Sequence, residues 1–353
     1  MASECDYMKL CLQLAAEGRY TTMPNPMVGC VIVKDERIVG QGVHLAPGSA
    51  HAEIQALRQA GNEAQGATLY VNLEPCCHYG RTPPCVPEII KAGIKKVVFA
   101  MEDPNPEVLG RGSQALQQHS LKVVQGVLKE EAFALNRAFC HYMTHSTPYV
   151  LAKWAMSLDG QMETSNASER QLTGGEAQQD VHELRQSTQA IMIGSHTAQL
   201  DDPALTVRHC AQILRQPQRI VVNKAADLNP ALKLFNGTLP GKTWLACAET
   251  VYTQAKTRFN PDSTELLPAP VNAAGLIDLE ALLKLLGQRA IMSLLVEGGR
   301  TLLNSFFQAK AVQEIITYIC PTLMSNLPQK QALASFHFEL LGPDVKIRTT
   351  PKN

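Results

Sequence analysis

Apolar and polar positions alternate along the chain with two periods, and the periods follow one another in a regular order. Residues 6–17 have the helical spacing of apolar side chains, and two apolar runs typical of a strand hairpin follow at 28–34 and 38–43. The same patterns then predict helices over 52–61, 86–92 and 114–118 and strands over 67–73, 95–101 and 121–125. Strands that alternate with helices predict a three-layer α/β sandwich, with the helices packed on the faces of one sheet.

A helix predicted over residues 130–143 leads out of this series. Residues 145–148, His-Ser-Thr-Pro, form the best linker in the chain. A second α/β series follows without repeating the first, with strands at 149–156, 190–194, 219–223, 243–246, 291–296 and 314–319 and helices at 175–186, 197–200, 279–286 and 300–308. Because 353 residues suffice for two ordinary domains, we predict one domain over residues 1–146 and another over 147–353.

Composition and charge narrow the classes of partner. Lysine plus arginine and aspartate plus glutamate number 32 each, so no overall field attracts nucleic acid or membrane. Aromatic residues make up only 5% and form no basic stripe of the kind that binds polynucleotides. No apolar run approaches the ~20 residues needed to cross a bilayer. The ten cysteines are scattered and no signal peptide precedes them, so we expect reduced thiols and a soluble, cytoplasmic protein.

One split constellation carries candidate chemistry. An H-A-E motif at residues 51–53 opens a predicted helix, and a proline-rich loop one strand later contains two P-C pairs. An imidazole and two thiolates, with the fourth position left to water, form a catalytic zinc site, and a nearby glutamate can carry protons without binding the metal. Zinc nucleobase deaminases have H-x-E and then P-C-x-x-C, whereas here eight residues separate Cys76 from Cys85. We therefore predict zinc ligands and a proton carrier, which are His51, Cys76 and Cys85 with Glu53.

Cys77 offers a second possible pairing of the thiols. Neighbouring side chains in a loop rarely point to one centre, and Cys76 has the proline before it that the deaminase pattern requires. Cys77 is then a packing residue or a spare thiol. A structural zinc site would need a fourth protein ligand, for which His78 and Cys77 are the nearby candidates, and it would leave Glu53 without a task. A catalytic site is therefore favoured over a non-enzymatic zinc module.

The second half contains weaker signals of a phosphate or cofactor site. A strand ends in Gly298-Gly299 and a helix follows, which suits close approach of a phosphate to free backbone N–H groups. A tight structural turn is the alternative reading of those glycines. No G-x-G-x-x-G follows any strand, so a standard dinucleotide-binding fold is not indicated. Lys153 lies in an otherwise apolar strand, where a lysine is seldom buried without a partner.

Longer motifs point to a known family. The first half resembles the pyrimidine deaminases of riboflavin biosynthesis through P-N-P-M-V-G-C at 24–30, H-A-E at 51–53, E-P-C-C-H-Y-G-R-T-P-P-C at 74–85 and D-P-N-P at 103–106. The second half resembles the partner reductase through K-W-A-M-S-L-D-G at 153–160, D-D-P-A-L-T-V-R at 201–208 and V-E-G-G at 296–299. Over nearly its whole length the chain thus resembles the bifunctional RibD family, with deaminase before reductase.

This resemblance implies a fold, two reactions and an assembly. It implies a cytidine-deaminase-like three-layer α/β/α domain followed by a dihydrofolate-reductase-like α/β domain. The first reaction would be zinc-dependent hydrolytic deamination of a diaminopyrimidinone that carries a ribosylamino 5′-phosphate. In the second, NADPH would reduce the ribosyl group to a ribityl chain. Glu53 would take a proton from water and return it to ammonia. The family also implies a homo-oligomer, a dimer or a tetramer.

The resemblance further implies which residues contact each ligand. For the deaminase substrate these are Asn25, His44, His78, Arg81 and Asn105. For the nicotinamide cofactor they are Ala155, Thr197, Asp201, Gly299, Arg300 and Thr301. For the reductase substrate they are Lys153, Asp159, Arg185, Leu205, Arg208 and Glu297.

The chain departs from the family pattern at two positions in the second half. Gln171 stands where an aromatic residue is usual, and Asn223 stands where an aspartate is expected. The alternative to a bifunctional enzyme is therefore a zinc deaminase of another nucleobase whose C-terminal domain is inactive or serves recognition only.

Overall fold

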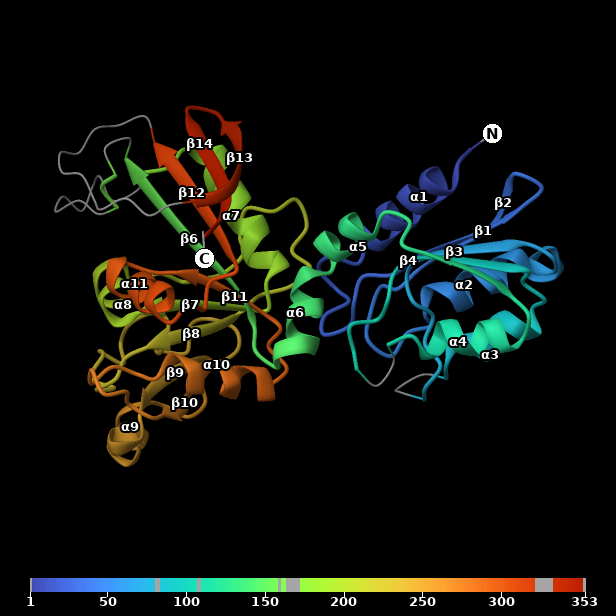
Figure 1. Ribbon diagram of the computed structural model, residues 1–353. Coiled ribbons are helices and arrows are strands. Elements are labelled where there is room, and N and C mark those ends of the chain that lie inside the picture. The colour runs from blue at the N-terminus through green and yellow to red at the C-terminus, as the bar shows by residue number, and fades with distance from the viewer. Residues whose placement is uncertain are drawn as a thin grey trace. The chain divides into compact units, whose positions relative to one another are not determined.

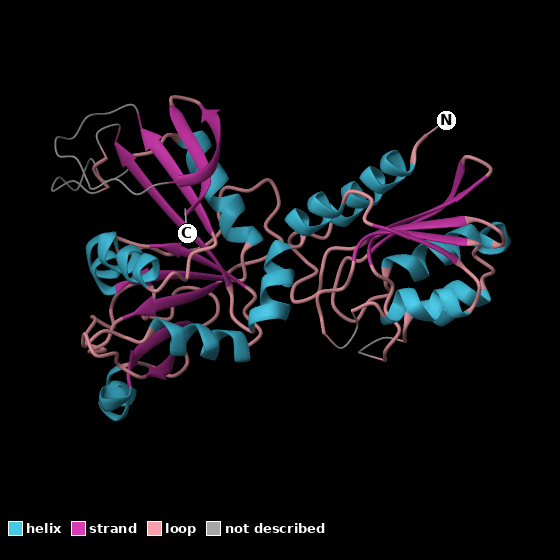
Figure 2. Ribbon diagram, viewed as in Figure 1, coloured by secondary structure: helices cyan, strands magenta, loops and turns pink. Residues whose placement is uncertain are grey.

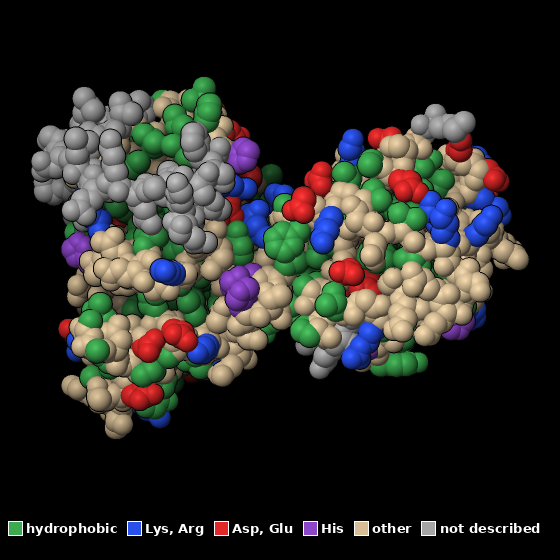
Figure 3. Space-filling model, viewed as in Figure 1, with side chains coloured by type: hydrophobic (Ala, Val, Ile, Leu, Met, Phe, Trp, Pro, Cys, Tyr) green, Lys and Arg blue, Asp and Glu red, His purple; other side chains and the backbone are tan. Residues whose placement is uncertain are grey.

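The computed structural model describes residues 2–79, 83–106, 109–157, 160–162, 172–320 and 333–351. It divides into two compact units, Met1–Ser146 and Thr147–Asn353, each built around one sheet (Figures 1 and 2). Basic and acidic side chains are interspersed over the face of each unit that Figure 3 shows. No helix in the described part of the chain is long and apolar enough to cross a membrane.

The first unit has a five-stranded sheet in the order β2-β1-β3-β4-β5. Its strands are β1 (Gly29–Lys34), β2 (Arg37–Val43), β3 (Thr68–Leu73), β4 (Lys96–Met101) and β5 (Lys122–Gln125). β1 pairs antiparallel with β2 and β3, whereas β3, β4 and β5 are parallel. Because the carboxyl ends of parallel strands meet at one edge, the loops that follow β3 and β4 leave the sheet side by side.

Helices cover both faces of this sheet, as the sequence predicted. α1 (Glu4–Ala16) and α5 (Lys129–Leu135) lie on one face, and α2 (Ala52–Ala60), α3 (Cys85–Lys91) and α4 (Arg111–Gln118) lie on the other (Figure 1). A 3-10 turn, η1 (Gly61–Ala64), follows α2. The start of α2 lies so close to β2 that a Cβ atom on Gly42 would be 2.0 Å from the carbonyl oxygen of Ala52.

The single helix predicted over residues 130–143 is wrong, because two helices occupy this stretch. α5 ends at Leu135, and α6 (Arg137–His145) begins after Asn136, whose φ of −102° and ψ of 20° are not helical. The buried Asn136 side chain accepts a hydrogen bond from Met27 N at 2.8 Å and donates one to Met27 O at 2.9 Å. The periodic pattern could not predict this break, since its cause lies more than 100 residues away in sequence.

The second unit has a nine-stranded sheet in the order β10-β9-β8-β7-β11-β6-β12-β14-β13. Its strands are β6 (Tyr149–Ser157), β7 (Ala190–Gly194), β8 (Gln218–Val222), β9 (Thr243–Ala248), β10 (Thr264–Ala269), β11 (Ser293–Glu297), β12 (Glu314–Cys320), β13 (Leu333–Leu341) and β14 (Asp344–Pro351). The strands from β10 to β12 are parallel, and the β13–β14 hairpin is joined to β12 in antiparallel pairing.

Two hydrophobic clusters cover the two faces of this sheet. Val150 and Ala152 of β6 belong to the cluster under α10 (Leu279–Gln288) and α11 (Arg300–Gln308). Leu151 belongs to the cluster on the other face, with α7 (Gly175–Ser187), α8 (Ser195–Asp201) and α9 (Tyr252–Arg258), which η3 (Glu249–Val251) precedes. A parallel sheet that is buried on both faces needs apolar residues in both orientations, which explains the continuous apolar runs. The predicted α/β class of both halves is confirmed.

In the described part of the second unit, five elements were not predicted from the sequence. They are η3, α9, β10, β13 and β14. β10 contains Pro268, which argues against a strand interior, but it lies at the edge of the sheet, where proline is tolerated. Among the described strands, β13 lies at the opposite edge and pairs with β14 alone.

Candidate active sites

Three side chains converge at the carboxyl edge of the first sheet. His51 immediately precedes α2, Cys76 lies in the loop after β3, and Cys85 begins α3. His51 Nδ1 lies 3.2 Å from Cys85 Sγ and 3.5 Å from Cys76 Sγ. In a tetrahedral zinc site, bonds of about 2.3 Å to sulfur and about 2.0 Å to nitrogen place these atoms about 3.5 Å apart. The three donor atoms are therefore spaced to bind one metal ion.

Backbone hydrogen bonds close the cysteine loop on itself. Cys85 N and Val86 N both donate to Cys76 O, at 3.0 and 3.1 Å, and Cys85 N also lies 3.3 Å from Cys76 Sγ. These bonds hold the two predicted thiol ligands against the first turn of α3, where N–H groups favour a thiolate. Cys77 is partly exposed and does not belong to the cluster.

The acidic groups of the cluster lie so close together that their negative charges would repel one another. The hydrogen bond with Cys85 lowers the pKa of the Cys76 thiol, while the same bond raises the pKa of Cys85 because a second thiolate would face the first. Glu53 is 4% exposed, and burial, followed by the charge of Cys76, raises the pKa of its carboxyl. A divalent cation would remove this conflict, because it stabilises both thiolates and the carboxylate together. The donor set thus fits the zinc ion that the sequence predicts.

Two predicted substrate residues lie beside the cluster. Asn25 Nδ2 donates a hydrogen bond to His44 Nε2 at 2.9 Å. The ring of His44 meets the ring of His51 edge-on, with 5.6 Å between centroids. Burial lowers the pKa of His44, which favours the neutral ring that can accept the bond from Asn25.

Buried amides that the sequence analysis did not assign hold the loop that carries Asn25. Asn72 on β3 donates to Met27 O at 2.9 Å and accepts from Gly29 N at 2.8 Å. Asn136, between α5 and α6, makes hydrogen bonds with both backbone groups of Met27. Asn72 could have been found from the sequence, because it is a polar residue inside an apolar run. Asn136 has no such signal.

Glu74 was also missed, although it opens the cysteine motif. Its buried carboxylate accepts hydrogen bonds from Asp103 N, Gly110 N and Ser113 N, at 3.3, 3.0 and 2.9 Å. It therefore holds the start of α4 and the loop that carries Asn105 against the end of β3.

The remaining predicted substrate residues of the deaminase lie in or near these loops. Asn105 N donates to Asp103 Oδ1 at 2.9 Å, and burial raises the pKa of Asp103 to about 6. His78 is exposed in the cysteine loop. Arg81 lies outside the described residues.

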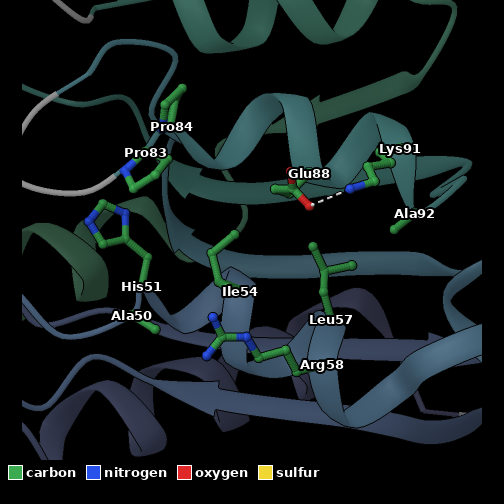
Figure 4. Close-up of a pocket in the computed structure, with 10 residues that line it drawn as sticks. All are labelled: Ala50, His51, Ile54, Leu57, Arg58, Pro83, Pro84, Glu88, Lys91 and Ala92. Atoms are coloured by element: carbon green, nitrogen blue, oxygen red, sulfur yellow. Dashed lines mark ion pairs between the residues drawn. The ribbon is translucent and has the colours of Figure 1, made fainter.

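A cavity of about 710 Å³ opens on the outer side of α2 and α3, with His51 at one end (Figure 4). Ile54 and Leu57 line its wall, and the Glu88–Lys91 ion pair, at 3.7 Å, lies at the far end. Asn25, His44 and the two cysteines of the cluster do not line it. This cavity is therefore separate from the side of the cluster that the predicted substrate residues occupy.

A buried ionic cluster occupies the carboxyl edge of the second sheet. Lys153 of β6 and Glu297 of β11 are register partners, and their side chains are 14% and 11% exposed. Arg185 of α7 binds Glu297 through two parallel hydrogen bonds, at 2.8 and 3.0 Å, and Lys153 Nζ lies 3.6 Å from the same carboxylate. Burial alone would raise the pKa of Glu297, but Arg185 and Lys153 outweigh it and lower the pKa to about 2. Lys153 thus has the partner that its buried position requires.

A cavity of about 600 Å³ lies at the ends of β7 and β8 and at the start of α11. Four of the predicted cofactor residues line it, namely Thr197, Gly299, Arg300 and Thr301. The free N–H groups at the start of α11 suit a phosphate there. Ala155 and Asp201 do not line the cavity, and Asp159 lies outside the described residues.

The departure at Asn223 has a local structural explanation. Its side chain donates to Asp227 Oδ1 at 3.0 Å and accepts from Asp227 N at 2.8 Å, so it closes the turn after β8. Lys224, the next residue, lines the 600 Å³ cavity instead. Gln171, the other departure, lies outside the described residues.

Comparison with known proteins gives the family. Residues 1–101 match the cytidine and deoxycytidylate deaminase zinc-binding region, and residues 148–346 match the RibD C-terminal domain. The riboflavin biosynthesis protein RibD of Escherichia coli K12 is 42% identical, over 96% of this chain and 97% of its own length. The chain belongs to the RibD family.

Solved structures of RibD proteins have the same fold. RibD of Acinetobacter baumannii matches with a TM-score of 0.87 and 35% identity, covering 99% of both chains. A Thermotoga maritima diaminohydroxyphosphoribosylaminopyrimidine deaminase/5-amino-6-(5-phosphoribosylamino)uracil reductase matches with a TM-score of 0.84 and 30% identity, again over 99% of both chains. The resemblance inferred from the motifs is therefore confirmed, and this member of the RibD family is a deaminase and reductase of riboflavin biosynthesis.

Serine substitutions at the three neighbouring cysteines test the geometry of the metal cluster. Cys76→Ser and Cys85→Ser should each lower bound zinc from one equivalent to well below half, since a serine hydroxyl is a poor zinc ligand. Cys77→Ser is the matched control and should retain the full equivalent. Metal content of the purified proteins, measured by atomic absorption, gives the answer, and zinc loss in Cys77→Ser would show that the cluster uses the other pairing.

Proposed function

We propose that the first unit deaminates 2,5-diamino-6-(5-phosphoribosylamino)pyrimidin-4-one and that the second unit then reduces the ribosyl group of the product with NADPH. The observation that carries this proposal is the His51–Cys76–Cys85 cluster with the buried carboxyl of Glu53 beside it. Its occurrence in a chain similar to a named deaminase/reductase supports the substrate.

In the deaminase half, His51, Cys76 and Cys85 would hold zinc, and Glu53 would move the protons. Zinc in such a site lowers the pKa of water enough to give a nucleophile near neutral pH. Glu53 follows His51 by two residues in the first turn of α2 and is shielded from solvent, so it can take a proton from water and pass it to the leaving amine. Asn25, paired with His44, can hydrogen-bond the edge of the pyrimidine.

The two alternatives have less support. In the part of the chain that the structure describes, the metal cluster has three protein donors, whereas a structural zinc site has four. A deaminase of polynucleotide bases needs a basic surface, and the charges on the visible face of each unit are mixed. A catalytic site for a small pyrimidine remains the reading that uses all the residues of the cluster.

Glu53→Gln tests the deaminase mechanism. This variant should bind zinc normally but release ammonia about a thousandfold more slowly, because the amide cannot carry the proton. Glu63→Gln, at an exposed carboxylate on the same unit, is the control. Ammonia release and NADPH consumption are measured together with the diaminopyrimidinone ribotide, with and without a zinc chelator. Unchanged ammonia release in Glu53→Gln would remove Glu53 from the mechanism.

The same assay tests the order of the two reactions. Both half-reactions should stop in the chelator, because reduction depends on the deaminated product. NADPH consumption should return when that product is supplied directly. Ammonia release without NADPH loss would instead favour the alternative with an inactive C-terminal domain.

In the reductase half, the ionic cluster would lie against the ribotide. NADPH supplies the two electrons of the reduction. Arg185 and Lys153 keep Glu297 ionised and fixed, so its carboxylate can bind sugar hydroxyls in one orientation. The 600 Å³ cavity, which opens at the neighbouring strand ends, would receive the cofactor.

Charges around that cavity favour NADPH over NADH. Lys224 and Arg300 line it, and none of the lining residues that the structure describes carries a carboxylate. Lys224 Nζ donates to Gly275 O at 2.8 Å, which places an ammonium group at the rim. NADPH differs from NADH by one phosphate, and a lysine without a neighbouring acid is suited to bind it.

Lys224→Gln tests this preference. The KM for NADPH should rise about tenfold, as expected for the loss of one charge-assisted hydrogen bond, whereas the KM for NADH should not change. Lys242→Gln is the control, because Lys242 is an exposed lysine just before β9 and lies at the amino ends of the strands, opposite the cavity. Equal effects on both cofactors would show that Lys224 does not bind the distinguishing phosphate.

We also propose a homo-oligomer that uses the edge of the second sheet. Among the strands that the structure describes, β13 pairs with β14 alone, and Phe338 and Leu340 on this strand are 70% and 73% exposed. An exposed apolar edge strand is a pairing surface unless something covers it. A second copy of the chain could cover it by pairing β13 with β13.

Glutamate substitutions at this edge test the assembly. The double variant Phe338→Glu and Leu340→Glu should be a monomer in sedimentation-velocity experiments at concentrations where the wild-type protein is a dimer or a tetramer. Phe133→Glu, at an exposed apolar residue of the first unit, should leave the assembly unchanged. An unaltered oligomer in the double variant would show that β13 is not the interface.

The state of the cysteines supports a cytoplasmic location. All ten cysteines are free, including the two proposed metal ligands. A reducing compartment keeps thiols in this state, whereas disulfides are usual in exported proteins. We therefore propose that the protein works in the cytoplasm.

A further inference from the structure

One face of α7 holds the backbone of the segment that carries Arg208. His182, Arg185 and Gln186 lie on this face with the spacing of one helical turn. His182 Nδ1 accepts from Arg208 N at 3.2 Å, and Gln186 Oε1 accepts from Leu214 N at 2.9 Å. Arg185, besides binding Glu297, donates to Thr206 O at 3.2 Å. These three bonds fix residues 206–214 to the helix at separate points.

His182 is built as a neutral hydrogen-bond acceptor. It is 5% exposed, and burial lowers the pKa of its ring to about 4, with Arg185, His209 and Arg208 acting in the same direction against Glu297. The ring of His209 packs edge-on against it, with 4.8 Å between centroids. Because Nδ1 accepts the bond from Arg208 N, the neutral ring carries its proton on Nε2.

The Arg208 side chain is exposed although its backbone is fixed. Gln216 holds the preceding residue from the other side, since it accepts from Val207 N at 2.7 Å and donates to Val207 O at 3.0 Å. Leu205, at the start of the segment, has a positive φ of 52°, which a flexible loop would not retain. Arg208 therefore presents an exposed guanidinium from a fixed backbone, an arrangement suited to a phosphate monoester.

We propose that His182 is a positioning residue of the reductase domain, which fixes the backbone of Arg208 so that its guanidinium binds the 5′-phosphate of the ribotide. This inference rests on the proposed function and on the contact between Arg208 and the reductase substrate that the sequence predicts. His182 does not touch the substrate in this scheme. Its effect on binding comes through one hydrogen bond to the backbone.

The test is a binding measurement on the full-length protein with NADP⁺ present. The probes are 5-amino-6-(5-phosphoribitylamino)uracil and the same compound without phosphate, titrated by calorimetry. In His182→Leu, the Kd of the phosphorylated compound should rise about tenfold, as expected for a buried N–H left without an acceptor, and the Kd of the other should not change. The kcat of the reductase at saturating substrate should stay within about threefold of wild type in the same estimate.

Two amide variants separate the hydrogen bond from the packing of the ring. His182→Asn places its amide oxygen near the position of Nδ1 and should recover most of the affinity, whereas His182→Gln reaches toward Nε2 and should not. Gln186→Leu removes the equally buried anchor at Leu214 and is the matched control. It should change the unfolding temperature as much as His182→Leu but leave both Kd values unchanged. If His182→Leu does not fold, the comparison of Asn with Gln still decides the question.

The outcomes distinguish failure of this inference from failure of the proposed function. Arg208→Ala should abolish the preference for the phosphorylated compound. If it does not, Arg208 does not bind the phosphate, and the proposed placement of the ribotide is wrong. If Arg208→Ala loses the preference and His182→Leu keeps it, only the role of His182 is refuted. Equal weakening of both compounds in His182→Leu would indicate a general structural role and would also refute the inference.

Discussion

Two thiolates and a buried carboxylate repel one another when they lie a few ångströms apart, and a metal cation bound between the thiolates and a neighbouring imidazole removes this repulsion. The fold of the first unit brings these groups together. The bonds from Cys85 N and Val86 N to Cys76 O fix the thiols against the start of α3, and α2 brings His51 and Glu53 to the same point. The opposed pKa shifts of Cys76 and Cys85 follow from this proximity. Neutral amides hold the surrounding loops, together with Glu74, whose carboxylate accepts hydrogen bonds from three backbone N–H groups.

The second unit solves a similar problem with its own side chains. Glu297 is buried, and Arg185 and Lys153 supply the positive charge that keeps it ionised. Because Arg185 also binds Thr206 O, the carboxylate and the segment before Arg208 are positioned by one guanidinium. In the first unit a bound metal ion would balance the negative charge of the cluster, whereas in the second unit Arg185 and Lys153 balance the charge of Glu297.

The sequence predicted the parts of both units whose causes are local. Most of the strands and helices, and the position of Glu53 in the first turn of α2, follow from periodicity and from short motifs. The choice of Cys76 over Cys77 as metal ligand stays a prediction, with which the spacing of the donor atoms agrees. The anchors could not be predicted in this way. Asn136, Glu74 and His182 act on backbone groups far away in sequence, so no short window contains both partners. Asn223 stands where the family pattern has an aspartate, and its side-chain amide closes the turn after β8.

The double anchoring of Met27 bears on where the first domain can be cut. The match to the zinc-binding region ends at residue 101, and all the proposed metal ligands precede this point. Yet Asn136, at the break between α5 and α6, binds both backbone groups of Met27 in the loop that carries Asn25. A fragment that ends with the zinc-binding region would keep its ligands and lose half of the support of its substrate loop. We therefore expect a fragment that keeps this loop in place to extend past the helix break, close to the start of the second unit.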